Sequence, residues 1–507
     1  MIQIPSFNAL IQKSIIDNWD RDALTDFKGQ TLQYHDVARK IEKIHILFEN
    51  SGIQKGDKIA LCGRNSSQWA VAFLATLTYG AIAVPILHEF NAEQIHNIVN
   101  HSEARLLFVG DHVATIIDPQ AMPTLEGIIN NPDYSLKISR TDKLTYAREH
   151  LNELYGKKFP KYFRKEHVNY YKEESPEELA VINYTSGTTG FSKGVMLPYR
   201  ALWSNYDFAY SVLGKTIKAG DPVISMLPMV HMYGMAFEFI FEFLHGCHVF
   251  YLNRVPSPAI IAQALQEVKP VIVIAVPLII EKIVRKKVFP KVQNNRMRLL
   301  LQMPVISKKV REMICQEVLK AFGGRMYEVI IGGAALHQQV KIVSPDPQRI
   351  PGEILTKGPN VMLGYYKNPE ATAETIDNDG WYHTGDLGTM DLDGNVFING
   401  RSKNMLLGPN GQNIYPEEIE DKLNSMTLVM ESIVVQRDNK LVALVHPDME
   451  EAKNMGFSDE DLRNVMEQNR NGLNEIIPAY EKITEIEIHE EEFEKTPKKS
   501  IKRYLYT

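Results

Sequence analysis

The sequence contains few cysteines, and its first ten residues lack the pattern of a signal peptide; both absences limit what kind of protein we expect. Cys62, Cys247 and Cys315 are scattered through 507 residues without a Cys-x-x-Cys spacing, which argues against a disulfide framework and a zinc site. We expect all three to be buried, reduced thiols. The first ten residues lack the basic start and apolar run of a secretion signal, so a cytoplasmic location is expected.

A surplus of positive charge is also absent. The formal net charge is −6 and the sequence pI is about 6.2, so nucleic acid is not expected as a partner. Hydrophobic residues make up 44% and charged residues 23% of the chain, which is typical of globular proteins. Its length exceeds that of one domain of about 100 to 200 residues, so more than one folded core is expected.

One uncharged stretch, residues 69–87, is long enough to cross a bilayer. Gly80, Pro85 and several polar residues interrupt it, so we predict a buried helix followed by a buried strand and no transmembrane segment. Peripheral membrane contact and the oligomeric state stay open.

The order of helical and strand-like segments predicts an α/β fold. An amphipathic helix is expected at residues 34–49, and strands are expected at 58–62, 84–86, 106–109, 179–184, 223–226, 271–275 and 328–331. Such alternation indicates sheets covered by helices. From Gly352 onward, turn-rich strands with Asp379-Gly380 and Asp393-Gly394 turns predict a small β-rich subdomain. The last hundred or so residues predict a small α+β domain.

The most informative segment is residues 184–194, which read YTSGTTGFSKG after the apolar strand at 180–183. Small residues let backbone N–H groups approach phosphate oxygens, hydroxyls add donors, and Lys193 supplies a positive charge. The spacing differs from that of a Walker A loop, which disfavours a P-loop NTPase. The segment predicts an anion-binding loop, and the alternative is an ordinary Gly/Ser/Thr surface loop.

This loop resembles the nucleotide signature of the adenylate-forming (AMP-forming) superfamily, which includes acyl-CoA synthetases, firefly luciferase and the adenylation domains of peptide synthetases. Further blocks are similar and follow in the family's order: Pro228 to Gly234 with His231, GGAAL at 332–336, GEI at 352–354, GY at 364–365, YHTGD at 382–386, GRSK at 400–403 and NGQNIYPEEIE at 410–420. Tyr415-Pro416 and the Thr-Pro-Lys-Lys tail are nearest to the long-chain fatty acid CoA ligase type.

The resemblance implies an ATP-dependent ligase that converts a fatty acid to acyl-AMP and then transfers the acyl group to coenzyme A, with Mg²⁺ as the metal. It also implies a large domain at residues 1–402 and a small mobile domain at 403–507. The implied catalytic residues are Lys499, Lys193 and His231. The implied nucleotide and coenzyme A contacts are Thr185, Ser186, Gly187, Thr188, Thr189, Gly190, Lys193, Gly332, Gly333, Ala334, Asp386, Arg401, Lys403 and Gly411.

Each implied role has a plainer alternative. Asp386 would accept hydrogen bonds from both ribose hydroxyls, or it is a turn residue. Arg401 would contact ribose and phosphate, or it forms a surface ion pair. Lys403 would be the hinge between domains, or a solvated lysine. His231 would gate the acyl pocket, or it is a core histidine. Gly411 would let the pantetheine arm pass close to the backbone, or it is a turn glycine.

The sequence departs from the family at two places. The Y-G-x-T-E motif, which would stack on adenine and hold magnesium, is absent between Val340 and Lys341, so no metal ligand is named. Either the sequence joins two separated segments, or the chain carries a true deletion. Loss of a central strand would impair the fold, so we favour the first. In the tail, Ser500 occupies the position of the usual catalytic lysine, and Lys499 is the best substitute.

These departures keep two other functions open. One is an adenylation enzyme that loads a fatty acid onto a carrier protein instead of coenzyme A. The other is a catalytically silent protein that binds nucleotide or acyl groups, which the missing motif and Ser500 would favour.

Overall fold

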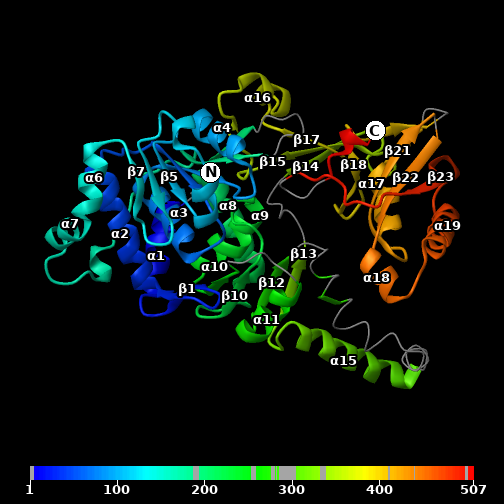
Figure 1. Cartoon of the computed structure of the whole chain (residues 1–507), viewed down its shortest axis with the longest axis horizontal. Coiled ribbons are helices and arrows are strands. Elements are labelled where there is room, and N and C mark those ends of the chain that lie inside the picture. The colour runs from blue at the N-terminus through cyan, green and yellow to red at the C-terminus, as the bar shows by residue number, and fades with distance from the viewer. Residues whose placement is uncertain are drawn as a thin grey trace. The chain divides into compact units, whose positions relative to one another are not determined.

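A computed structural model describes residues 5–185, 193–252, 258–275, 280, 283–284, 304–331, 339–408, 412–438, 440–496 and 501–506 (Figure 1). The chain divides into two compact units. Unit 1 comprises Met1–Thr185, Ser192–His337 and Pro359–Asn368, and unit 2 comprises Ser186–Phe191, Gln338–Gly358 and Pro369–Thr507. These two units do not test the predicted domain boundary between residues 402 and 403, which stays a prediction.

The largest sheet of unit 1 has eight strands in the order β16-β9-β8-β4-β3-β5-β6-β7. The strands are β3 (Lys58–Cys62), β4 (Ile82–Ile86), β5 (Leu106–Val109), β6 (Gly127–Asn130), β7 (Leu136–Ser139), β8 (Leu179–Tyr184), β9 (Gly194–Pro198) and β16 (Gly364–Tyr365). The central strands pair in parallel and are apolar on both faces. This pattern is typical of strands that are covered by helices on both sides.

Helices precede these strands and alternate with them along the chain. They are α1 (Phe7–Asp17), α2 (Tyr34–Ser51), α3 (Ser67–Tyr79), α4 (Ala92–Ser102), α5 (Asp111–Ile116), α6 (Asp142–Glu149) and α7 (Leu151–Lys158). α2 ends where Gly52 adopts a left-handed conformation with φ of 82°, which glycine takes without strain. α3 and β4 confirm the predicted buried helix and strand within residues 69–87. Among the described residues, no helix is both long and apolar enough to span a membrane.

A second sheet of unit 1 has the order β10-β11-β1-β2, and a separate parallel pair joins β12 to β13. The strands are β1 (Asp22–Asp26), β2 (Thr31–Gln33), β10 (Pro222–Ser225), β11 (His248–Tyr251), β12 (Ile272–Ala275) and β13 (Glu328–Ile331). The neighbouring helical segments are α8 (Tyr199–Leu213), α9 (Met232–Met235), the π-helical η3 (Ala236–Ile240), α10 (Phe241–Leu244), α11 (Pro258–Val268) and α15 (Pro304–Ala321). One core cluster packs α11 and Phe322 against β10 and β12.

The cysteine prediction holds for two of the three residues. Cys62 and Cys247 are buried free thiols, as expected. Cys315 is also free but exposed, so its predicted burial is wrong. It lies on α15, where the neighbouring residues 311–313 and 316 are exposed as well, because this stretch of the helix presents little surface to the core.

Unit 2 contains a four-stranded antiparallel sheet in the order β14-β15-β17-β18, formed by β14 (Gln339–Val343), β15 (Gly352–Lys357), β17 (Tyr382–Met390) and β18 (Val396–Arg401). A small hairpin joins β19 (Leu406–Leu407) to β20 (Asn413–Ile414), and a three-stranded sheet contains β21 (Val429–Arg437), β22 (Lys440–Pro447) and β23 (Ile483–Ile488). The helices are α16 (Pro369–Thr375), α17 (Pro416–Asn424), α18 (Met449–Asn454) and α19 (Asp459–Ile476). α17 and α19 share an apolar core with β21 and β22.

The Val340–Lys341 junction, where the sequence departs from the family, lies in a β-strand of unit 2. Both residues lie within β14, where Val340 is opposite Thr356 and Lys341 is opposite Leu355 of β15. The five-residue ladder has no shift in register, because the buried side chain of Ile342 and its exposed neighbours keep the alternation of an edge strand. The sequence as given forms one strand here, and the expectation that it joins two separated segments stays a prediction.

Candidate active site

The predicted phosphate-binding loop begins and ends in two paired strands. β8 and β9 are antiparallel with Tyr184 opposite Gly194, and the Thr185 amide donates a hydrogen bond of 3.0 Å to the Lys193 carbonyl. The loop therefore leaves and re-enters the sheet at neighbouring points. Five of the predicted ligands lie outside the described residues, namely Ser186, Gly187, Thr188, Thr189 and Gly190.

Packing at the base of this loop is tight. A β-carbon added to Gly194 would lie 3.0 Å from Cγ2 of Ile182 and 3.1 Å from Cζ of Tyr184, so these two side chains would have to move slightly to admit a larger residue. The Tyr184 hydroxyl lies 2.7 Å from Nδ1 of His101. Burial raises the pKa of Tyr184, which keeps this hydroxyl neutral and able to hydrogen bond. These contacts fix the point at which the loop starts.

Lys193 lies over an aromatic ring. Its Nζ atom is 4.9 Å from the ring centroid of Tyr365 in β16, and β16 pairs with β9 so that Tyr365 is opposite Val195. A ring face orients an ammonium group without neutralising it. No carboxylate of the described part of the chain forms an ion pair with Lys193, so its charge is available to an anion.

The segment that contains His231 is tied to the same strand. Asn183 of β8 donates from Nδ2 to the Val230 carbonyl over 2.7 Å, and Asn65 donates to the Leu227 carbonyl over 2.6 Å. His231 is half-buried and precedes α9. The strand that leads into the phosphate loop and the segment before His231 are therefore joined by a hydrogen bond.

A buried carboxyl group supports the His231 segment from the other side. Oε2 of Glu238 accepts hydrogen bonds from the amides of Met226 and Leu227 over 2.9 and 2.7 Å. Glu238 lies in η3, and such π-helical turns are frequent at functional sites. Burial raises the pKa of Glu238 well above its ordinary value, and the hydrogen bonds oppose this rise only in part. The sequence did not predict a role for Glu238, because the motif around His231 does not indicate that Glu238 binds the amides of Met226 and Leu227.

The strand that precedes a third predicted motif, β13, also contacts the His231 segment. The Tyr233 hydroxyl, two residues after His231, lies 3.5 Å from the carbonyl oxygen of Ile330 near the end of β13. The predicted adenine platform follows that strand, but Gly332, Gly333 and Ala334 lie outside the described residues. Unit 1 thus brings together the ends of the strands that carry three of the predicted motifs.

Unit 2 brings two further predicted residues into contact. Asp386 of β17 and Arg401 of β18 are opposite each other, and Arg401 Nε lies 2.7 Å from Asp386 Oδ1. Partial burial raises the pKa of Asp386, Arg401 opposes the rise, and Glu417 adds to it. The carboxylate keeps a second oxygen that can accept hydrogen bonds. This arrangement is compatible with the ribose-binding role. It is equally the surface ion pair named above as the plainer alternative for Arg401.

The turn that carries Asp386 is held by Glu353, a residue whose function the sequence did not indicate. One carboxylate oxygen of Glu353 lies 2.9 Å from His383 Nδ1, and the other accepts a hydrogen bond of 3.2 Å from the Gly385 amide. Gly385 has φ of 71°, which suits glycine at this bend. The motif blocks GEI and YHTGD therefore form one clamp, in which Glu353 holds His383 and Gly385. The presence of both blocks in the sequence was the signal that could have indicated this contact.

The other predicted residues of unit 2 are only partly described. Lys403 is exposed in the turn after β18, while Gly411 and Lys499 lie outside the described residues. On either side of Lys499, the described residues Lys495 and Ile501 form an antiparallel bridge. The chain beyond this bridge is anchored by an ion pair between Arg503 and the buried Glu420.

A magnesium site does not emerge from the described residues. Within them, no group of three or more His, Cys, Asp and Glu side chains is arranged to hold a metal ion. Mg²⁺ therefore stays a prediction of the resemblance, and no ligand for it is assigned.

The family follows from comparison with known proteins. Residues 12–333 match the AMP-binding enzyme family, and residues 404–506 match the AMP-binding enzyme C-terminal domain. The chain belongs to the AMP-binding enzyme family. The resemblance inferred from the motifs is thereby confirmed, as is the mixed α/β fold with a large N-terminal part and a smaller C-terminal part.

Individual relatives differ in the acids they are named for. The chain is 28% identical over 455 residues to a long-chain-fatty-acid–CoA ligase of Escherichia coli O6:H1, covering 81% of this chain and 79% of the relative. It is 28% identical over 436 residues, covering 80% of each chain, to a propanoyl:CoA ligase of Rhodococcus jostii whose named substrate carries a two-ring indenyl group. The fold is similar to the A-PCP didomain of a carboxylic acid reductase from Segniliparus rugosus in complex with AMP, with a TM-score of 0.77, 17% identity, and coverage of 99% of this chain and 81% of that one.

Proposed function

We propose that this protein activates a carboxylic acid with ATP to form acyl-AMP and pyrophosphate, and then transfers the acyl group to coenzyme A. One observation carries the proposal: unit 1 ties the base of the phosphate loop, the His231 segment and the end of β13 to one another. Each of these segments matches a nucleotide-binding or acyl-binding block of the family. Their association is what a site that joins an acid to ATP requires.

The first step needs charge neutralisation more than proton transfer. A carboxylic acid is already ionised at neutral pH, so its oxygen can attack the α-phosphorus without a general base. Attack brings one anion toward another, and pyrophosphate departs with further charge. Lys193, oriented by the ring of Tyr365, would stabilise this charge together with the backbone N–H groups of the loop.

Coenzyme A is the proposed acceptor in the second step, in which the thiol attacks the acyl carbon and AMP leaves. The names of the E. coli and R. jostii relatives support this acceptor. The S. rugosus structure is named as a didomain with PCP, so the fold itself suits both acceptors. We retain the carrier-protein ligase as the second candidate for that reason.

A long-chain fatty acid is the proposed substrate. The E. coli relative supports this choice, and so do the half-buried side chains of Met232, Tyr233 and Phe237, which place apolar surface beside His231. Met235 and Phe239 in the same segment are fully buried and belong to the core. An acyl chain would therefore contact the half-buried side chains first.

The remaining roles are proposals that rest on the family's motifs. Asp386 and Arg401 would contact the ribose, and Lys403 would act as the hinge of a mobile C-terminal domain. Gly411 would leave room for pantetheine, and Lys499 would assist adenylate formation. A cytoplasmic location is proposed with them.

The three candidate functions can be separated in one experiment. Purified protein is incubated with ATP, palmitate and either coenzyme A or an acyl carrier protein, and the products are measured by mass spectrometry. Palmitoyl-CoA supports the proposal, and a palmitoylated carrier protein supports the second candidate. Binding of nucleotide without palmitate-dependent pyrophosphate release would identify a catalytically silent protein and overturn the enzyme proposal.

A further inference from the structure

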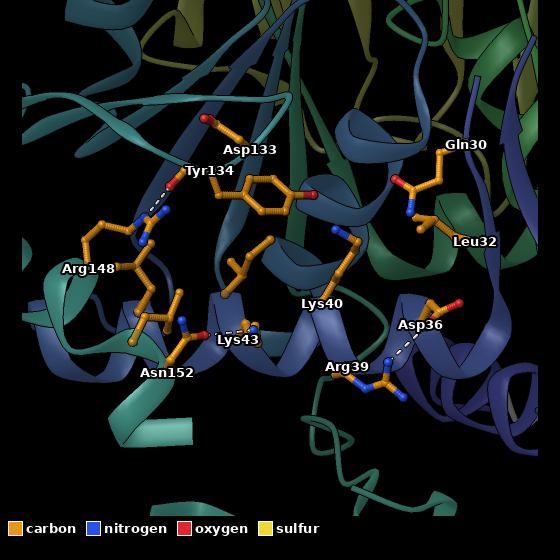
Figure 2. A pocket seen from close by; sticks show the side chains of 13 residues that line it. Gln30, Leu32, Asp36, Arg39, Lys40, Lys43, Asp133, Tyr134, Arg148 and Asn152 are labelled. Atoms are coloured by element: carbon orange, nitrogen blue, oxygen red, sulfur yellow. Dashed lines mark hydrogen bonds and ion pairs between the residues drawn. The ribbon is translucent and has the colours of Figure 1, made fainter. Parts of the chain in front are cut away.

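A cavity of about 440 Å³ in unit 1 lies between α2, the β6–β7 turn and the start of α7 (Figure 2). Arg39, Lys40 and Lys43 of α2 border it on one side, and Arg148 and Asn152 border it on the other. None of these residues belongs to a family motif identified in the sequence. We propose that this cavity binds a small organic phosphate, a ligand with a dianionic phosphate group and a planar or apolar body.

The cavity has an excess of positive charge. Its lining includes four cationic side chains, Arg39, Lys40, Lys43 and Arg148, but only two carboxylates. Arg39 forms an ion pair of 3.0 Å with Asp36. The excess of two positive charges matches a phosphate monoester, which carries about two negative charges near neutral pH, better than the single charge of a fatty carboxylate.

Among the described residues, the two lysines contact aromatic rings and an amide but no carboxylate, and Lys43 Nζ lies 5.3 Å from the ring centroid of Tyr155. Lys43 Nζ donates to Asn152 Oδ1 over 3.0 Å, and Lys40 Nζ lies 5.7 Å from the ring centroid of Tyr134. Neither forms an ion pair with a carboxylate of the described residues. Burial lowers the pKa of both lysines, and the nearby cations lower it further. Like charges about one helical turn apart destabilise a helix. A bound anion would therefore offset the repulsion between Lys40 and Lys43.

Tyr134 gives the cavity an ordered aromatic wall. Its φ of 56° is left-handed, which is unusual and strained for an aromatic residue. The conformation is held at both ends, because the hydroxyl donates to the Gln68 carbonyl over 2.9 Å and the Tyr134 carbonyl accepts from Arg148 Nε over 2.6 Å. Apolar side chains, including Leu47 and Leu151, complete the lining. A planar or apolar body would pack against this surface while its phosphate meets the lysines.

The test uses pyridoxal 5′-phosphate, a phosphate ester that also carries an aldehyde. A neutral lysine amine adds to the aldehyde carbon, water leaves to form an imine, and added borohydride reduces the imine to a stable amine. Labelling is done on the full-length protein without ATP, because ATP is itself an organic phosphate, and any label on Lys193 in the phosphate loop is counted separately. The modified lysines are then mapped by peptide mass spectrometry.

We expect one label per chain, on Lys40 or Lys43, and roughly ten-fold less label when inorganic phosphate is present in excess. The Lys40→Met/Lys43→Met variant should lose the label, and Lys215→Met, which changes an exposed lysine of unit 1, should keep it. Labelling spread evenly over exposed lysines, or labelling that phosphate does not reduce, would overturn the proposal. Protection by palmitate but not by phosphate would also overturn it, by identifying a carboxylate site. If the double variant does not fold, the labelling map and phosphate protection of the wild-type protein decide the matter alone. The outcome does not depend on the proposed ligase activity.

Discussion

The ammonium group of Lys193 lies 4.9 Å from the ring centroid of Tyr365, although the two residues are far apart in the sequence. The contact exists because β16 adds to the edge of β9, which places Tyr365 beside the end of the phosphate loop. The position of β16 is held by Lys367 and Tyr366, which contact the Glu103 carboxylate over 2.9 and 3.0 Å. A strand outside the loop thus orients the only charged side chain within it.

Removal of the ring should weaken ATP binding. We expect Tyr365→Leu to raise the KM for ATP roughly two- to five-fold, because a partly exposed cation–π contact contributes about 0.5–1 kcal/mol. Tyr365→Phe keeps the ring and is the matched control, and it should behave like the wild type. Lys193→Ala should have a larger effect than either. Equal KM values for the Leu and Phe variants would contradict the proposed role of the ring.

Asp386 should determine how the protein recognises ribose. The wild type is expected to bind ATP more tightly than 2′,3′-dideoxy-ATP, and Asp386→Asn should lose much of this preference. Hydrogen bonds to a charged group contribute about 1.5–3 kcal/mol, so the loss should be roughly ten-fold or more. The measurement is the ratio of the two dissociation constants. An unchanged ratio would leave the Asp386–Arg401 contact as an ordinary ion pair.

Glu353 should act by holding the turn of Asp386. Glu353→Ala removes the acceptor for both His383 and the Gly385 amide, and we expect the free energy of unfolding to fall by about 1–3 kcal/mol. Glu353→Gln keeps one acceptor oxygen, so its free energy of unfolding should fall less. Glu370→Gln, at an exposed position of α16, is the control in the same unit. Urea unfolding measures all three, and equal stabilities of the Ala and control variants would refute the clamp.

Glu238 and Glu242 should make the protein less stable as pH rises. Both carboxyls are buried, and burial raises the pKa of each well above the ordinary value of 4.5. The folded chain therefore retains protons that the unfolded chain releases above that pH. The stability contribution is complete below about pH 4.5 and declines toward the raised folded pKa, by at most about 1.4 kcal/mol per pH unit and group.

The corresponding variant is Glu238→Gln, which keeps an oxygen to accept from the amides of Met226 and Leu227. Its free energy of unfolding should decline less between pH 5 and pH 7 than that of the wild type. Glu149→Gln, at an exposed position of α6, should retain the wild-type slope. If Glu238→Gln declines as steeply as the control, the carboxyl is ionised in the folded protein.

Local patterns in the sequence predicted much of unit 1. The amphipathic helix expected at residues 34–49 is α2 (Tyr34–Ser51), because apolar spacing fixes its buried face and Gly52 ends it. The short apolar runs at 58–62 and 106–109 are buried parallel strands, β3 and β5, with the predicted bounds. Such elements could be predicted because burial on both faces leaves a continuous apolar run.

Long-range contacts could not be predicted in the same way. Glu353 and His383 are separated by a helix and a turn, and only the pairing of β15 with β17 brings them together. The cationic cavity likewise forms only when the β6–β7 turn packs next to α2, although three of its cations are visible in the α2 sequence. Cys315 was expected in the core because free cysteines are frequently buried, but its stretch of α15 is exposed.

The most direct test of the proposed chemistry is ATP–pyrophosphate exchange with and without added palmitate. Labelled pyrophosphate should enter ATP only when palmitate is present, and Lys193→Ala should reduce the exchange strongly while Lys215→Ala leaves it unchanged. Exchange that is independent of palmitate, or absent in a protein that binds ATP, would contradict the conclusion that this chain joins an organic acid to AMP.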